Sequence, residues 1–298
     1  ASAGERRAVA VIAGGHTAFV YLERDGEVLL DKRTASVAEE EAGEVPLTLR
    51  RVWDFAMTAP LDELRFILET RRVNKAAAER AFAGEFGHCV GRTLRCERER
   101  QVMGDSIFSR ILSYTSAACD ARMAGAMVPV MSNSGSGNQG ITASVPVVIF
   151  AESLKSDDET RLRAVLLSDL VTIALKQGIG KLSAYCGAVS AGCGSGAGIA
   201  LLKGYDDRAI ESVITNALAI TSGLICDGAK SSCAAKIAMS VEGALVALDM
   251  VKNEQVFREG DGIVQSSVDE TAEAVGRIAS RGMVSTDREI IRVMLGEK

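Results

Sequence analysis

The segment at residues 186–194 constrains the fold most, because it reads Cys-Gly-Ala-Val-Ser-Ala-Gly-Cys-Gly. Side chains this small form a helix face that allows neighbouring helices to approach closely, and we interpret Cys193 as a small buried hydrophobe. The whole chain shares this character, with 29 glycines and only 4% aromatic residues. That balance favours closely packed helices over an aromatic-filled β-sandwich.

The first residues of the chain favour strands instead. Residues 8–12 are rich in β-forming side chains, and residues 19–22 can pair with residues 28–30. Between the last two segments lies Asp25-Gly26, a dipeptide that tolerates the positive φ angles of a type I′ turn. The sequence therefore predicts a hairpin or a small sheet near the N-terminus.

From Pro46 onward the apolar residues follow a helical period, and Pro60 separates the first two predicted helices. Ser156 with Glu159, and Ser267 with Glu270, have the spacing of a capping box at the start of a helix. The helices predicted from there on cover residues 162–176, 182–202, 208–221, 232–251 and 272–278.

These patterns predict an α+β protein in which a small β-containing N-terminal region precedes a mainly α-helical domain. We place the first region at residues 1–95 and the helical domain at residues 96–298. A length of 298 residues with 47% hydrophobic side chains is enough for a sizeable core.

Charge and hydropathy exclude two classes of partner. The net charge of −5 has the wrong sign for a protein that binds nucleic acid. The most apolar stretch, residues 233–250, is interrupted by Lys236, Glu242 and Asp249, so no membrane-spanning segment is predicted. Seven cysteines, an odd number in a chain too long for a disulfide scaffold, indicate reduced thiols and a cytoplasmic location.

A polar loop at residues 132–138 is the first candidate for binding chemistry. Residues 135–140 match the dinucleotide fingerprint Gly-x-Gly-x-x-Gly, but Pro146 follows too early for an uninterrupted helix, and we do not expect NAD. Free backbone N–H groups and small polar side chains suit a carboxylate better. An ordinary turn between helices is the alternative. The candidate residues for substrate binding are Ser132, Asn133, Ser134, Gly135, Ser136 and Asn138.

Cysteines give the second candidate. Cys226 and Cys233 flank a chain reversal, with Cys233 in the first turn of the next helix, so their sulfurs can converge. The positive end of that helix and Lys230 would favour thiolates. With Cys186 from a neighbouring helix, three soft ligands result, which suit an iron–sulfur cluster or a zinc site. Cys89, Cys96 and Cys119 show no such arrangement, so we assign them no ligand role.

The sequence resembles the L-cysteine desulfidase family, which is related to the α chain of iron–sulfur L-serine dehydratases. The polar loop and the Cys-Asp-Gly-Ala-Lys motif are its most specific elements. The matching segments are residues 12–17, 131–142, 186–188, 225–230, 281–283 and 286–287.

This resemblance implies a lyase that converts L-cysteine and water to hydrogen sulfide, ammonia and pyruvate. It implies a [4Fe-4S] cluster in place of pyridoxal phosphate, held by the residues that match the family's ligands, Cys186, Cys226 and Cys233. An iron without a protein thiolate would be a Lewis acid for the leaving group, and the polar loop would hold the carboxylate of the small amino-acid substrate.

The chain departs from the family at its N-terminus. Family members begin with a further segment in which a cysteine in a Cys-Thr-Glu-Pro context serves as the base, and no such stretch occurs here. We therefore expect residues 1–95 to be incomplete without a preceding segment and this chain alone to be inactive. The segment was cut, is a separate N-terminal polypeptide, or was lost; a homo-oligomer is the other expected assembly.

Within this chain the candidates for a base are weak. His16 lies between two glycines and a threonine, where close backbone approach or a structural role would each explain it. Lys230 is nearest the motif, although pairing with Asp227 or with the negative charge of the cluster is the stronger interpretation. Two other functions stay open: an L-serine or L-threonine dehydratase with the same cluster, and a non-catalytic iron–sulfur or zinc protein.

Overall fold

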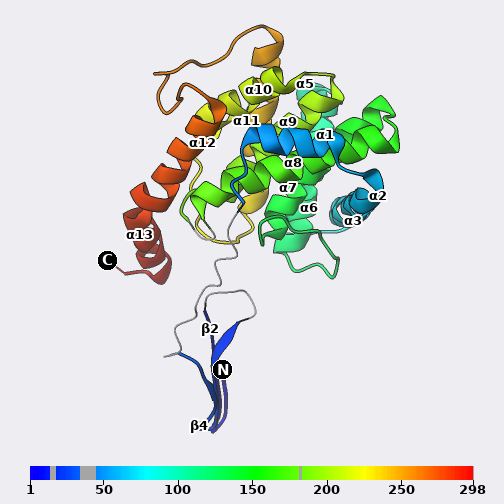
Figure 1. Cartoon of the computed structure of the whole chain (residues 1–298). Coiled ribbons are helices and arrows are strands. Elements are labelled where there is room, and N and C mark those ends of the chain that lie inside the picture. Colours follow the sequence, from blue (N-terminus) through cyan, green and yellow to red (C-terminus); the bar gives the residue numbers. More distant parts are fainter. Residues whose placement is uncertain (14–17, 34–44, 181–182, 298) are drawn as a thin grey trace. The chain divides into compact units, whose positions relative to one another are not determined.

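The computed structural model describes residues 1–13, 18–33, 45–180 and 183–297. Contacts divide the chain into two compact units, Ala1–Pro46 and Leu47–Lys298. The first contains a four-stranded sheet and the second is helical, which confirms the predicted α+β class (Figure 1). Residues 47–95 group with the helical unit by contacts. The division into functional domains at residues 1–95 and 96–298 stays a prediction.

The sheet of the first unit is an antiparallel meander with the order β1-β2-β3-β4. Its two central strands and β4 form where the β-rich segments predict them. Asp25 and Gly26, between β3 and β4, have φ angles of 51° and 88°, which confirms a turn with positive φ at both central residues. The strands are β1 (Ser2–Ala3), β2 (Arg6–Ile12), β3 (Phe19–Arg24) and β4 (Glu27–Asp31).

The second unit is built from helices. Pro60 separates the first two, as predicted, and none of the described helices is long and apolar enough to cross a membrane. The helices are α1 (Leu49–Thr58), α2 (Leu61–Leu64), α3 (Leu68–Phe82), α4 (Val90–Thr93), α5 (Glu97–Met103), α6 (Ile107–Met123), α7 (Gly137–Leu154), α8 (Asp158–Ile179), α9 (Gly187–Leu202), α10 (Asp207–Thr221), α11 (Cys233–Lys252), α12 (Val268–Arg277) and α13 (Val284–Leu295).

One of the two predicted helix caps is confirmed and the other is wrong. The Ser267 side chain accepts a hydrogen bond from the Glu270 backbone N–H at the start of α12. Helix α8, in contrast, is capped by Asp157, whose carboxylate accepts from the Thr160 N–H at 2.9 Å. An aspartate one residue after Ser156 takes the capping position, because its carboxylate is an equally strong acceptor for the free N–H groups.

Helix α9 lies at the centre of the unit and packs against α7, α8, α10 and α11 (Figure 1). A Cβ atom at Gly198 would lie 2.7 Å from the Ala164 carbonyl oxygen of α8 and 2.8 Å from a methyl of Val147 in α7. A Cβ at Gly192 would lie 2.8 Å from the Ser240 carbonyl oxygen of α11. These contacts confirm that the small-residue stretch allows close helix packing. Cys193, on the same helix, is only 1% exposed.

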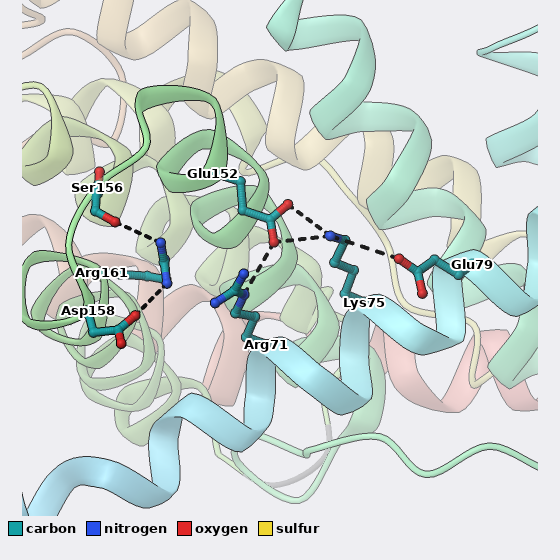
Figure 2. A network of polar contacts seen from close by, with 7 residues as sticks. All are labelled: Arg71, Lys75, Glu79, Glu152, Ser156, Asp158 and Arg161. Atoms are coloured by element: carbon teal, nitrogen blue, oxygen red, sulfur yellow. Dashed lines mark hydrogen bonds and ion pairs between the residues drawn. The ribbon is translucent and has the colours of Figure 1, made fainter.

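Ion pairs join α3 to the end of α7, and a separate set of polar contacts lies at the start of α8 (Figure 2). Glu152 of α7 accepts from Lys75 at 2.9 Å and from Arg71 at 3.2 Å, both on α3. Beside them, Arg161 of α8 donates to the Asp158 carboxylate and the Ser156 carbonyl, each at 2.7 Å. The Glu152 contacts fix α3 against α7, and α3 in turn contacts the polar loop, as described below.

We expect Gly198→Ala to lower the free energy of unfolding by about 1–3 kcal/mol, because a methyl group overpacks the contact with Ala164 and Val147. Gly196→Ala is the matched control on the same helix, since its Cβ would meet the Ala244 methyl at 3.1 Å, where a small shift relieves the contact. Both variants gain the same helix propensity. Urea unfolding followed by circular dichroism measures the difference, and equal stability of the two variants would contradict the role of α9.

Candidate active site

A short backbone bridge brings Cys186 and Cys226 together. Cys186 immediately precedes α9, and Cys226 lies in the loop after α10. The Cys186 N–H donates to the Leu224 carbonyl at 3.1 Å, and the Cys226 N–H donates to the Ala184 carbonyl at 2.6 Å. These two hydrogen bonds hold the segments side by side, and the two thiols lie within hydrogen-bonding reach of each other.

Cys233 is the first residue of α11, as the sequence predicts for the chain reversal after Cys226. Its sulfur accepts a hydrogen bond from the Lys230 backbone N–H at 3.4 Å, and its thiol donates to the Gly228 carbonyl at 3.7 Å. Cys233 also lies close enough to Cys186 to affect it electrostatically. The structure therefore brings the three predicted cysteines into one region.

The surroundings of the thiols favour a thiolate at Cys226. A hydrogen bond from the Cys186 thiol lowers the pKa of Cys226 to about 6, and the Lys236 charge adds to this effect. The same hydrogen bond and burial raise the pKa of Cys186, which keeps its proton. One member of the pair is thus prepared to act as an anionic ligand.

Lys236, not Lys230, is the cation that pairs with Asp227. The Lys236 ammonium donates to the Asp227 carboxylate and to the Ile225 carbonyl, the latter at 3.0 Å. Lys236 lies one turn into α11, where the helix directs it back over the loop that carries Cys226. Lys230 is exposed and forms no direct ion pair with Asp227 among the described residues, although its charge helps to lower the pKa of Asp227 after the stronger effect of Lys236.

The polar loop forms a tight turn at the start of α7. Asn133 and Ser136 exchange two backbone hydrogen bonds of 3.1 and 2.9 Å, with Ser134 and Gly135 at φ angles of 50° and 77° between them. The Ser136 side chain caps α7 by accepting from the Gln139 N–H. The loop is therefore a turn before a helix, the alternative left open from its sequence, and it presents the N-terminal end of α7.

Two of the three glycines of the fingerprint-like segment have a local role. Gly135 takes the positive φ of the turn, and a Cβ at Gly140 would clash with the Met131 carbonyl and lie 2.9 Å from the Ser132 carbonyl carbon. Residues 127–131 before the turn form no strand, and α7 leads into another helix. Pro146 lies inside α7, so its expected interruption of that helix is wrong.

Two side chains at the start of α7 contact residues beside the cysteines. The Gln139 side chain covers Gly187, where a Cβ would lie 2.6 Å from the Gln139 amide nitrogen. Asn138 accepts from the Cys119 thiol at 3.5 Å, and Cys119 is close enough to Cys233 to interact electrostatically. Cys119, which the sequence pattern did not single out, therefore lies beside the site.

A buried asparagine of α3 fixes the approach to the loop. The Asn74 side chain accepts from the Met131 N–H at 2.8 Å and donates to the Ser144 hydroxyl at 2.8 Å and the Gly140 carbonyl at 3.2 Å. It is fully buried. Sequence reasoning missed this residue, because only the tertiary contact between α3 and α7 gives it partners.

Helix α8 contributes two ionisable groups, also missed from the sequence. Asp169 accepts from the Asn133 amide at 3.0 Å, and burial raises the pKa of its carboxyl to about 6. Lys176 follows about two turns later on the same face. Burial lowers the pKa of Lys176, while the Cys226 and Cys186 thiols oppose that effect. A carboxyl that titrates near neutrality can accept and release a proton.

The two candidate bases predicted from the sequence are His16 and Lys230. His16 lies outside the described residues. Lys230 contributes its backbone N–H to Cys233. Among the described residues, no three His, Cys, Asp or Glu side chains are grouped closely enough to hold one metal ion. A cluster makes a different demand, since each ligand binds a separate iron atom.

We expect Asp169→Asn to stabilise the protein by about 1–3 kcal/mol at pH 7.5 and to have little effect at pH 4. The carboxyl ionises near 3.8 when unfolded and near 6 when folded, so its contribution to stability is lost as the pH rises through about 6. Asparagine does not titrate and keeps an acceptor for Asn133. Urea unfolding across this pH range measures the difference, with exposed Asp62→Asn as the control. A pH-independent difference would contradict the buried, ionising carboxyl.

Comparisons with known proteins show the family to which the chain belongs. The family model described as "Serine dehydratase alpha chain" matches residues 27–292. A UPF0597 protein of Bacteroides thetaiotaomicron is 51% identical over 98% of this chain and 68% of its own length. UPF0597 proteins of Bacteroides fragilis (BF3560) and Desulfitobacterium hafniense (DSY1109) are 50% and 41% identical, over 98% and 96% of this chain and 68% and 66% of their lengths. No solved structure matches. The chain belongs to the serine dehydratase alpha chain family.

Proposed function

We propose that this chain is an iron–sulfur-dependent lyase that eliminates the β substituent of a small amino acid, with L-cysteine as its substrate. The observation that carries the proposal is the bridge that holds Cys186 beside Cys226, with Cys233 at the adjoining helix start. Membership of the serine dehydratase alpha chain family supports a lyase of this class. The resemblance to L-cysteine desulfidases supports cysteine as the substrate.

The donor set fits a [4Fe-4S] cluster. Cys186, Cys226 and Cys233 are soft sulfur ligands from three separate segments, and the lowered pKa of Cys226 favours the thiolate that iron requires. Lys236 places a positive charge beside these sulfurs, which offsets the negative charge of a thiolate-ligated cluster. When bound through three thiolates, the cluster would supply a Lewis acid for the leaving group of the substrate.

The residues of the chain would bind the substrate and transfer its proton. We propose that the polar loop and the N-terminal end of α7 hold the carboxylate, since this end of a helix offers free N–H groups and a positive dipole. Asp169, whose pKa is about 6, is the candidate base that the structure adds to Lys230 and His16. Its hydrogen bond from Asn133 places it beside the loop.

L-Serine is the second candidate substrate, favoured by the name of the family whose model matches. Cysteine and serine differ in the leaving group, a thiol or a hydroxyl, while the carboxylate and amino group are shared. The same residues would therefore bind both. The alpha chain designation of the family also supports a partner polypeptide or an oligomer.

We expect Cys186→Ser, Cys226→Ser and Cys233→Ser each to prevent reconstitution of the cluster, because a serine hydroxyl is a poor ligand for iron. Cys193→Ser is the matched control, since Cys193 is buried within α9 and is not one of the three proposed ligands. Iron content, acid-labile sulfide and visible absorption after anaerobic reconstitution measure the outcome. A cluster that survives in Cys186→Ser but is lost in Cys193→Ser would overturn the ligand assignment.

We expect the reconstituted Bacteroides thetaiotaomicron relative to release sulfide and pyruvate from L-cysteine. This chain should be at least about a hundredfold slower only if Asp169 is not the base, since that is the usual contribution of a general base. Both proteins are assayed anaerobically with L-cysteine and with L-serine. Full activity of this chain would assign the base to a residue within it. Inactivity of both proteins with intact clusters would contradict the lyase and favour a non-catalytic iron–sulfur protein.

A further inference from the structure

The ammonium group of Lys176 has no direct partner among the described residues. Lys176, on α8, is only 8% exposed. Its ammonium forms no hydrogen bond or ion pair in the described part of the chain, whereas that of Lys236 donates to Asp227 and Ile225. An ammonium group held away from water carries a large desolvation cost unless an anion compensates it. The Cys226 and Cys186 thiols act on this charge only through space, so an anion in direct contact would stabilise it further.

The position of Lys176 places that anion at the cysteine site. Lys176 lies within electrostatic range of Cys186 and Cys226. On the same face of α8, about two turns earlier, Asp169 binds Asn133 of the polar loop. The stretch of α8 from Asp169, at the polar loop, to Lys176, near the thiols, is about two turns long. A site of this length suits a small molecule and not a macromolecule.

A second unpartnered group borders the same region. The Gln139 side-chain oxygen is buried and has no hydrogen-bond donor among the described residues, and its side chain covers Gly187 next to Cys186. Two further buried hydroxyls without partners, those of Tyr185 and Ser190, also flank Cys186 in the sequence. Buried polar atoms are nearly always paired in folded proteins, so the unpaired Gln139 oxygen beside Gly187 indicates a site for a polar ligand.

We propose that Lys176 binds the α-carboxylate and Gln139 the α-ammonium group of an amino-acid substrate. A cation beside a hydrogen-bond acceptor is complementary to a zwitterion, since the ammonium of Lys176 attracts the carboxylate and the Gln139 carbonyl accepts from the amino group. The polar loop then contributes neutral hydrogen bonds, while Lys176 supplies the charge that the loop lacks. The inference rests on the proposed function, which names an amino acid as the substrate.

Three unreactive probes separate the two contacts. L-Alanine carries both charged groups and has no leaving group, propionate carries only the carboxylate, and ethylamine carries only the amine. Their affinities for the anaerobically reconstituted protein are measured by isothermal titration calorimetry, so no turnover is needed. Lys203→Met, an exposed lysine at the end of α9, is the control for loss of a positive charge.

We expect Lys176→Met to weaken L-alanine and propionate about tenfold to a hundredfold and to leave ethylamine unchanged, because it removes one charge-assisted contact. Gln139→Leu should weaken L-alanine and ethylamine but not propionate. Lys176→Arg should restore part of the affinity for propionate. Lys176→Met should also unfold at the same or a higher temperature without ligand, since it removes an uncompensated buried charge. Lys176→Gln serves for the same titrations if the methionine variant does not fold.

Unchanged affinity of Lys176→Met for L-alanine would overturn the inference. So would a loss of cluster absorption in Lys176→Met with normal L-alanine binding to the cluster-free protein, because Lys176 would then compensate the charge of the cluster. The proposed function is tested separately by turnover. If L-alanine binding depends on Lys176 but no elimination occurs, the amino-acid site is supported and the lyase activity is contradicted. If Lys176→Met retains both turnover and L-alanine affinity, the lyase activity is supported and the role of Lys176 in this site is contradicted.

Discussion

The close packing of α9 is the constraint on which the rest of the helical unit depends. Its glycines bring the backbones of α8 and α11 so near that a single methyl group would collide with their carbonyl oxygens. Helix α9 also contacts α7 and α10, so four helices pack directly against it. Cys186 stands at its N-terminal end, and the helix therefore sets the point around which the other site residues gather.

Local signals in the sequence predict much of the fold. The type I′ turn at Asp25 and Gly26, the cap at Ser267 and the break at Pro60 each follow from the residue itself and its immediate neighbours. The predicted cap at Ser156 is wrong because Ser156 and the adjacent Asp157 can both accept from the free N–H groups. The sequence alone does not show which of the two side chains does so. The predicted interruption of the helix at Pro146 is wrong because a buried, tightly packed helix tolerates a proline that would break an isolated helix.

The site was predictable only in part, for a physical reason. Residue type and spacing single out the two cysteines at the chain reversal. The positions of Cys226 in the loop and Cys233 at the start of the next helix are therefore predictable from the sequence. Asn74, Lys176 and Gln139 are common residues whose significance comes from burial and from partners on other helices. No pattern along the chain distinguishes a buried, unpartnered lysine from an exposed one, and only the packed structure does.

The backbone bridge that holds Cys186 beside Cys226 is centred on Tyr185 and Ile225, and it has a consequence for assembly. It is made of peptide groups, so it forms as the helices fold and does not depend on which side chains occupy positions 186 and 226. The conformational entropy of gathering two distant segments is lost during folding and not when a cofactor is inserted. If these cysteines bind the proposed cluster, the chain would reach the insertion step with Cys186 and Cys226 already adjacent.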